Sequence, residues 1–282
     1  MAKFILSAFA DEASPDFTAQ LETLKRHEIP LVEVRGVDGK NILDLTDEEL
    51  DIAVEKLNAY GIGVSAVGSP IGKIGIHDDF APHFEKFKRA VEIAKKLGTT
   101  RIRMFSFFMP KDEDPEQYFD TVVEQTKAMV EYAEANGVHC CHENEKGIYG
   151  DTLARVQKLH AAVPGLRLVF DPANYIQCHD RPADNFAALS HMIDYMHIKD
   201  AFLKDGAVVP AGEGDGSVPE ILASLAKTEN TYMLTLEPHL AVFSGLQNLQ
   251  DEELTHKYTY ESNEAAFDAA VAALKNILST IA

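Results

Sequence analysis

The sequence predicts an α/β fold of the (β/α)8 TIM barrel type, formed as a single domain by residues 1–282. Short β-rich runs alternate with longer amphipathic segments along the whole chain, which is the pattern of parallel strands covered by helices. The strand–helix units reach eight, and the last segment is helical, as in a TIM barrel. An open doubly wound sheet is the alternative, but no Gly-x-Gly-x-x-Gly motif follows the first strand to support it.

The expected strands are short apolar runs that begin near Phe4, Leu31, Ile62, Arg101, Val138, Leu166, Ile193 and Tyr232. Residues two apart in a strand share a face, so Glu33 should lie beside Arg35, and Arg101 beside Arg103. We expect these charged side chains to project into the barrel, where a buried charge needs a partner. This favours Arg101 as the partner of Glu33 and leaves Arg103 open.

The helices are expected between the strands, and several have recognisable ends. Ser14 and Asp114 each precede a proline, as N-caps do, while Gly61, Gly98 and Gly137 follow the last turns. The expected helices span residues 15–27, 47–60, 81–97, 115–136, 152–161, 184–189, 218–227 and 263–281.

Composition indicates a soluble globular protein, with 46% hydrophobic and 25% charged residues and a formal net charge of −19. Such a charge repels polyphosphate and anionic lipid headgroups, so we expect neither a nucleic acid nor a membrane partner. No apolar segment approaches the length of about 20 residues that a membrane helix needs. Three cysteines, two of them adjacent, provide no disulfide framework. We therefore expect a reducing, cytoplasmic location, with residues 1–10 as a first strand rather than a signal peptide.

Four consecutive apolar runs end on side chains that can bind a metal: Glu143, Asp171, His197 and Glu237. If the runs are neighbouring parallel strands, their carboxyl ends lie on one face of the barrel, where such barrels place their chemistry. Three carboxylates and one imidazole suit Mn²⁺, Mg²⁺, Co²⁺ or a catalytic Zn²⁺. Each residue alone is as well explained as a helix cap, a loop carboxylate or a core histidine. Their shared place at four strand ends favours a divalent metal site.

A cation in such a site has open positions that two neighbouring oxygens of a hydroxy-ketone can fill. It would then favour proton loss from the carbon between them by stabilising an enediolate. Lys199 lies on the same strand face as His197 and has two readings: it stabilises the enediolate oxygen, or it forms an interior ion pair with a carboxylate such as Asp200.

Basic residues at or just after strand ends are candidates for binding a phosphate or carboxylate of the substrate. They are Arg35, Lys73 and Arg103. Lys73 closes the segment Ser69-Pro-Ile-Gly-Lys73, in which Ser69 and a glycine allow close approach to a ligand, although the segment lacks P-loop spacing. We interpret it as a substrate-binding loop.

The sequence resembles the xylose isomerase-like TIM barrels, a superfamily of sugar phosphate isomerases and epimerases that also includes endonuclease IV. The resemblance covers nearly the whole chain. It is carried by the motifs Ser7-Ala-Phe-Ala-Asp-Glu12, Glu33-Val-Arg-Gly36, Gly68-Ser-Pro-Ile-Gly-Lys73, Arg103-Met-Phe-Ser-Phe107, His142-Glu-Asn-Glu-Lys146, Phe170-Asp-Pro-Ala-Asn174, His197-Ile-Lys-Asp200, Gly212-Glu-Gly-Asp-Gly216 and Leu236-Glu-Pro-His239.

The resemblance implies a divalent-metal-dependent isomerase or epimerase of a small sugar, sugar phosphate or polyol ketone. The four strand-end residues match the metal ligands of ketose 3-epimerases, in which the residues matching Glu143 and Glu237 also act as opposed acid and base. Asn174 stands where those epimerases have a substrate-binding histidine and endonuclease IV has a metal ligand, and we expect it to bind the substrate. That difference, with the missing Asp-x-His after the seventh strand, argues against DNA repair.

Two alternatives stay open. One is a dehydratase of a keto-inositol-like substrate, because elimination begins with the same proton abstraction beside a carbonyl. The other is a non-catalytic, metal-retaining sugar-binding barrel, because a fold does not determine a function. The long stretch from His239 to Asn263 has three readings: a cover over the site, a contact in a homo-oligomer, or a surface excursion.

Overall fold

A closed parallel barrel forms the centre of the computed structural model, which describes residues 2–241 and 257–281. Its strands follow the order β1-β12-β9-β8-β7-β6-β5-β2. They are β1 (Lys3–Ala8), β2 (Leu31–Val34), β5 (Gly63–Gly68), β6 (Arg101–Met104), β7 (His139–Glu143), β8 (Arg167–Phe170), β9 (Ile193–Ile198) and β12 (Thr231–Leu236). All eight expected strands are present, and the predicted TIM barrel is confirmed.

Every neighbouring pair of barrel strands is parallel. The ring closes at β1, where Ala8 is in register with Leu236 of β12 on one side and with Val32 of β2 on the other. All the carboxyl ends therefore open at one end of the barrel, and the side chains just beyond them can meet there.

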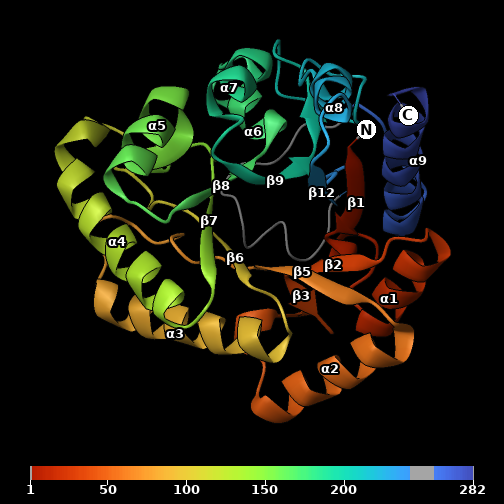
Figure 1. Cartoon of the computed structure of the whole chain (residues 1–282), viewed down its shortest axis with the longest axis horizontal. Coiled ribbons are helices and arrows are strands. Elements are labelled where there is room, and N and C mark those ends of the chain that lie inside the picture. Colours follow the sequence, from red (N-terminus) through yellow and green to blue (C-terminus); the bar gives the residue numbers. More distant parts are fainter. Residues whose placement is uncertain (1, 242–256, 282) are drawn as a thin grey trace.

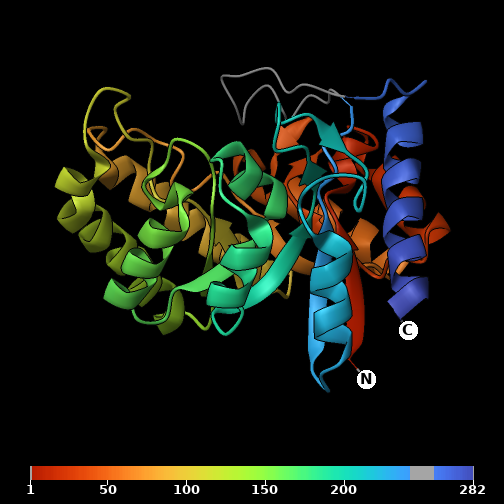
Figure 2. The same ribbon diagram turned by 90° about the horizontal axis from the view of Figure 1, so that it is seen from above.

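Helices surround the barrel (Figure 1). They are α1 (Phe17–Arg26), α2 (Asp47–Tyr60), α3 (Phe80–Lys96), α4 (Phe119–Ala135), α5 (Leu153–Ala162), α6 (Pro172–Gln177), α7 (Pro182–Leu189), α8 (Val218–Ala226) and α9 (Asn263–Ile281). The last helix, α9, packs against α8 and the turn after β1 (Figures 1 and 2).

Most helix ends lie close to the predicted positions. Asp114 caps the short 3-10 helix Pro115–Tyr118, and Gly61 ends α2 in the left-handed conformation. The predicted cap at Ser14 is wrong, because the side chain of Asp16 accepts the hydrogen bond from the Ala19 N–H at the start of α1. The sequence reading also missed α6 and two small hairpins, β3–β4 (Gly36–Val37 with Lys40–Asn41) and β10–β11 (Asp200–Ala201 with Val208–Val209).

The apolar core has two parts. The larger part lies between the outer face of the barrel and the helices and includes Phe17, Phe87 and Phe267. A small apolar layer crosses the barrel interior and consists of Leu31, Ala66, Cys141, Val169, Tyr195 and Met233. Residues nearer the carboxyl ends of these strands are buried and charged, such as Glu33, Arg103 and His197. Apolar packing thus fills one interior layer, and polar pairing stabilises the layer above it.

Arg101 does not pair with Glu33 as the sequence reading favoured. Its guanidinium contacts Asp194 of β9 at 3.2 Å, and Asp194 also binds Arg167 at 3.0 Å. The carboxylate of Glu33 instead accepts a 2.8 Å hydrogen bond from the Tyr195 hydroxyl. Strand direction decides this difference, because Arg101 and Asp194 both lie at the amino ends of their strands, β6 and β9, whereas Glu33 lies nearer the carboxyl end of β2.

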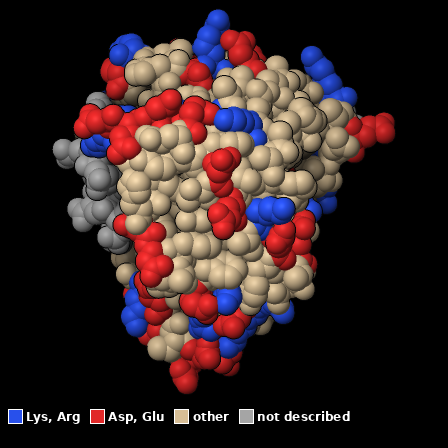
Figure 3. All heavy atoms as spheres, turned by 90° about the vertical axis from the view of Figure 1, so that its left-hand side faces the viewer, with Lys and Arg blue, Asp and Glu red and all other residues tan. Residues whose placement is uncertain are grey.

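The surface mixes charges of both signs. On the face that carries α4, acidic and basic side chains alternate with uncharged areas (Figure 3). Among the described residues, no helix is both long and apolar enough to cross a membrane. Cys140, Cys141 and Cys178 are free thiols, and the cytoplasmic location stays a prediction.

Backbone contacts hold the Ser69–Lys73 loop against the segment that follows β6. The Phe105 N–H donates to the Ile71 carbonyl at 2.8 Å, and the Phe107 N–H donates to the Gly72 carbonyl at 2.9 Å. Gly72 has a φ of +87°, and a Cβ there would lie 2.1 Å from the Phe105 carbonyl oxygen. Only glycine fits this position, because both the dihedral angle and the space exclude a side chain.

We predict that Gly72→Ala lowers the free energy of unfolding by more than about 3 kcal/mol, since it combines backbone strain with a clash. Gly61→Ala is the matched control, because Gly61 has a φ of +65° but no atom within 4 Å of the added Cβ. It should cost only about 1 kcal/mol, the strain of a left-handed residue. Urea unfolding of both variants measures the difference, and equal losses would contradict this account of the loop.

Candidate metal centre

Three carboxylates and one imidazole meet at the carboxyl end of the barrel. Glu143 ends β7, Asp171 follows β8, His197 lies in β9, and Glu237 follows β12. One candidate ligand atom from each lies within 4.8 Å of the others, and all four residues are buried. The structure therefore brings together the four residues that the sequence grouped, and we call them the acidic cluster.

The imidazole of His197 is the centre of the acidic cluster. Its Nδ1 lies 3.0 Å from Glu143 Oε1, 3.0 Å from Glu237 Oε2 and 4.0 Å from Asp171 Oδ2. Its Nε2 lies 3.3 Å from Glu33 Oε2 on the opposite side of the ring. A proton on Nε2 can be donated to Glu33, which leaves Nδ1 as the nitrogen that can bind a cation.

Asp171 has two roles that the sequence reading treated as alternatives. Its Oδ1 accepts a 3.0 Å hydrogen bond from the Asn174 N–H and so caps α6, with Pro172 in the first turn. Its Oδ2 faces the acidic cluster and lies 2.8 Å from Lys199 Nζ. The cap fixes the orientation of the carboxylate and directs its second oxygen inward.

Buried cations contact the acidic cluster from several strands. Lys199 also lies 3.4 Å from Glu237, and Arg103 Nη1 lies 3.1 Å from Glu143 and 3.3 Å from Glu237. The predicted ion pair between Lys199 and Asp200 is wrong. Asp200 instead accepts hydrogen bonds from the backbone N–H groups of Gly212, Gly214 and Gly216. The glycine-rich motif around Gly214 therefore binds a carboxylate of this chain.

The other residues predicted to bind substrate also have partners within the protein. Arg35 makes two 2.9 Å bonds to Asp11 and a 3.1 Å contact to Glu237. Lys73 contacts Glu145 at 2.8 Å, the Ser69 hydroxyl donates to the Arg103 carbonyl, and the Asn174 amide donates to Glu143 at 3.1 Å. These four residues and Arg103 surround the acidic cluster or support its neighbours, and their contacts with a substrate stay predictions.

Aromatic residues near the cluster pack against its charged groups. Phe9 lies edge-on to His197, and the guanidinium groups of Arg35 and Arg103 lie over its ring. Phe105 contacts Lys73 and Arg103 in the same way. Such contacts stabilise the positive charges of these arginine and lysine side chains where they are held away from water.

Glu12 is a residue for which the sequence predicts no role beyond its place in the Ser7–Glu12 motif. Glu12 ends the 3-10 helix Ala10–Glu12, and its carboxylate accepts a 2.8 Å hydrogen bond from the His239 N–H. Glu12, Glu237 and His239 form a second buried group of candidate ligands. Arg35 lies 3.3 Å from Glu12 and 3.1 Å from Glu237, so a guanidinium already supplies positive charge to these acids. The adjacent acids of Asp11-Glu12 after the first strand were the only sequence signal.

Burial and charge shift the pKa values within the acidic cluster. Burial raises the pKa of Asp171 to about 7, and Glu143 and Glu237 add to the rise against the effect of Lys199. Burial also opposes the charged forms of Glu237 and His197. Lys199 and His197 nevertheless hold the pKa of Glu237 well below its usual range, and the carboxylates hold the pKa of His197 well above 6.5.

The donor set fits a divalent cation on its chemistry. The ligand atoms are oxygens with one imidazole nitrogen, and their second contacts orient them toward a common point. Acids outnumber bases around this point, because Asp11, Glu12, Glu33, Glu143, Asp171 and Glu237 face Arg35, Arg103 and Lys199. Buried carboxylates in excess need added positive charge.

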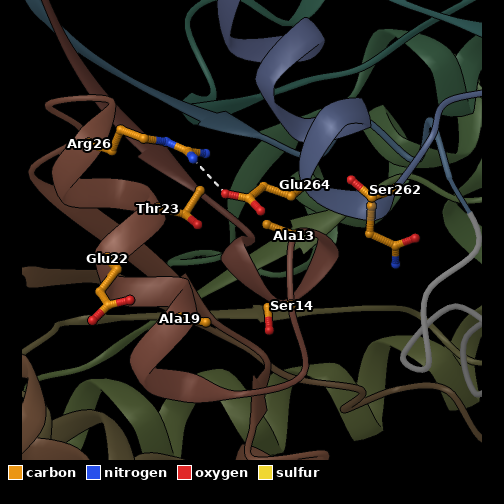
Figure 4. A pocket seen from close by; sticks show the side chains of 9 residues that line it. Ala13, Ser14, Ala19, Glu22, Thr23, Arg26, Ser262 and Glu264 are labelled. Atoms are coloured by element: carbon orange, nitrogen blue, oxygen red, sulfur yellow. Dashed lines mark hydrogen bonds and ion pairs between the residues drawn. The ribbon is translucent and has the colours of Figure 1, made fainter.

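A separate surface pocket of about 530 Å³ lies between α1 and the start of α9 (Figure 4). Its lining includes Glu22, Arg26 and Glu264 and no member of the acidic cluster. Arg26 is paired with Glu264 at 2.5 Å and with Asp268 at 2.6 Å. The pocket has no grouping of residues that would suggest chemistry.

Comparison with known proteins identifies the family. The sequence profile of the xylose isomerase-like TIM barrels matches residues 21–275. The chain belongs to this family. No match was found among curated proteins.

Solved structures share the fold of this xylose isomerase-like barrel at low identity. One is the probable 3-DHS dehydratase AsbF involved in petrobactin synthesis from Bacillus anthracis, at 17% identity and a TM-score of 0.73, covering 98% of this chain and 99% of that one. An IOLI protein with a binding zinc atom has 18% identity and a TM-score of 0.74 with the same coverage. An L-ribulose 3-epimerase has 16% identity and a TM-score of 0.72, covering 100% of this chain and 96% of that one.

We predict that the protein binds Mn²⁺ and that its affinity falls by tenfold or more for each pH unit between about 7 and 5. Asp171 has a pKa of about 7, and its proton must leave before the second oxygen can bind a cation. Lower pH therefore weakens binding, and each bound ion releases protons. Calorimetry in buffers of different ionisation enthalpy measures both effects.

The matched variants for this prediction are Asp171→Asn and Glu116→Gln. The first removes a ligand and should weaken Mn²⁺ binding by a factor of about 100 or more. The second alters an exposed carboxylate paired with Lys158 and should leave binding unchanged. Wild-type affinity in Asp171→Asn would show that the acidic cluster is not the site.

Proposed function

We propose that this barrel is a divalent-metal-dependent isomerase or epimerase that acts on a small sugar, sugar phosphate or polyol ketone by proton transfer through an enediolate. The observation that carries the proposal is the placement of two buried carboxylates, Glu143 and Glu237, each 3.0 Å from the same imidazole nitrogen of His197. A polyol has hydrogens on carbons beside its carbonyl, and carboxylates held at one point can remove and return such a proton.

The residues that would hold the cation are Glu143, Asp171, His197 and Glu237. Mn²⁺, Mg²⁺, Co²⁺ and Zn²⁺ all suit this donor set. When bound, a divalent cation supplies Lewis-acid stabilisation of negative charge that develops on the substrate oxygens. The shared fold with a zinc-binding IOLI structure is consistent with this assignment.

Both glutamates are prepared to act as bases. The pKa of Glu143 is lowered, since His197 and Arg103 outweigh the effect of burial, and that of Glu237 is lowered further. Arg103 Nη1 contacts both carboxylates, and the Asn174 amide donates a hydrogen bond to the other oxygen of Glu143. These contacts fix two ionised carboxylates in place. In an isomerisation, the carboxylate that accepts the proton returns it to the neighbouring carbon. In an epimerisation, the second carboxylate, once protonated from water, delivers a proton to the opposite face of the same carbon.

Lys199 supplies positive charge beside the reacting carbons. It stays protonated, because Asp171 and Glu237 outweigh burial and raise its pKa above the ordinary value. An ammonium group at this place stabilises an enediolate oxygen more than the neutral ketone, which is the requirement for catalysis. The interior ion pair and the catalytic role are therefore compatible for this lysine.

We predict that Mn²⁺-loaded protein exchanges deuterium from D₂O into the carbon beside the carbonyl of a ketose such as L-ribulose or D-tagatose. Glu143→Gln and Glu237→Gln should each slow the exchange by a factor of about 100 or more, the contribution of a general base. Proton NMR measures the rate. Glu264→Gln is the control, because it changes an exposed ion pair with Arg26.

The metal content of each variant separates the two roles of the glutamates. A variant that keeps Mn²⁺ but loses exchange has lost its base, while one that loses Mn²⁺ has lost a ligand. Release of water from a keto-inositol would instead establish the dehydratase, which uses the same first step. Binding of ketoses without exchange or elimination would favour the non-catalytic sugar-binding barrel.

A further inference from the structure

We propose that the substrate of this site is an uncharged polyhydroxy ketone and that its phosphate ester is excluded. The inference rests on the proposed function and names the class of substrate within it. It comes from the charged side chains around the acidic cluster. The sequence predicted that some of these side chains, such as Lys73, bind a phosphate.

Each buried cation around the acidic cluster is neutralised by a carboxylate of the protein. Arg35 makes a two-pronged contact with Asp11, with both bonds at 2.9 Å. Lys73 contacts Glu145 at 2.8 Å. Arg103 bridges Glu143 and Glu237, and Lys199 lies between Asp171 and Glu237. A phosphate would have to replace one of these carboxylates, and the displaced acid would then be buried without a partner.

The Lys73–Glu145 pair borders the acidic cluster. The charges of Arg103 and Glu143 act on Lys73, and those of Glu143 and Lys199 act on Glu145. The ammonium group of Lys73 lies 4.4 Å from the centre of the Phe105 ring. A phosphate that entered beside the cluster would therefore meet Glu145 together with Lys73.

Buried acids outnumber buried bases around the cluster. Among the described residues, seven acids surround four bases and the imidazole of His197, so an anion would enter a site that already has an excess of carboxyl groups. The acids are Asp11, Glu12, Glu33, Glu143, Glu145, Asp171 and Glu237, and the bases are Arg35, Lys73, Arg103 and Lys199. Residues 242–256 cannot supply another basic side chain of this kind, since they contain three acids and no lysine or arginine.

One uncommitted polar atom beside the acidic cluster, the side-chain oxygen of Asn174, favours a hydroxyl group. The Arg103 Nε–H, a donor without a hydrogen-bond partner among the described residues, can serve a hydroxyl oxygen as well. Asn174 donates through its amide nitrogen to Glu143 and to the Asn144 carbonyl, so its Oδ1 is an acceptor. This buried oxygen has no hydrogen-bond partner among the described residues. Carboxylate oxygens and an amide oxygen accept hydrogen bonds from hydroxyls, whereas an ionised phosphate has only acceptors to offer.

Inorganic phosphate tests the inference without knowledge of the sugar. Calorimetry of wild-type protein after chelation of metal should detect only weak phosphate binding. Glu145→Gln removes the carboxylate charge beside Lys73 and should bind phosphate on the order of tenfold more tightly than wild type, since the phosphate no longer competes with that carboxylate. Asp51→Asn, which removes a carboxylate from the exposed Lys96, is the control and should leave phosphate binding unchanged. Phosphate binding to wild type as tight as to Glu145→Gln would overturn the inference.

A second measurement compares each ketose with its ester on Mn²⁺-loaded protein. L-Ribulose should bind at least about tenfold more tightly than L-ribulose 5-phosphate, and D-tagatose more tightly than its 6-phosphate. Tighter binding of the esters would reject the inference, while exchange in D₂O would still uphold the proton-transfer enzyme. If no ketose exchanges deuterium, the proposed proton-transfer function is rejected instead. The phosphate titration then still tests whether the site excludes phosphate.

Discussion

The contact between His197 and two glutamates organises the carboxyl end of this barrel. Glu143 and Glu237 approach Nδ1 from strands that are not neighbours, and Glu33 holds the opposite nitrogen. A buried imidazole among carboxylates is stable only if every charge has a partner. Arg103 and Lys199 supply those partners to the glutamates, so the arrangement is one connected network.

The network depends on the way the barrel interior is divided. A layer that includes Tyr195 and Met233 closes the barrel below the charges. Tyr195 also donates its hydroxyl to Glu33, which links the apolar layer to the support of His197. Water is excluded from below, and electrostatic interactions in such surroundings are stronger than at the surface. The same burial raises the pKa of Asp171 to about 7 and makes any bound cation compete with protons.

The charges that prepare the site for proton transfer also limit what can enter it. Arginine and lysine side chains at strand ends are often anion sites, yet Arg35 and Lys73 have carboxylate partners of their own. Their positive charge lies against Glu237 and Glu145. Electrostatic balance therefore connects the proposed chemistry with the proposed preference for an uncharged sugar.

The sequence by itself determined the strands, most helices and the four members of the acidic cluster, because alternation and strand-end position are local properties. Pairing was decided only by the tertiary structure. The choice of Asp194 rather than Glu33 for Arg101, and of Asp171 rather than Asp200 for Lys199, depends on strand register around a closed ring. The roles of Glu12 and the short helix α6 were missed for the same reason. The pairing of charges inside a barrel depends on contacts between residues far apart in the chain, and local sequence patterns do not predict such contacts.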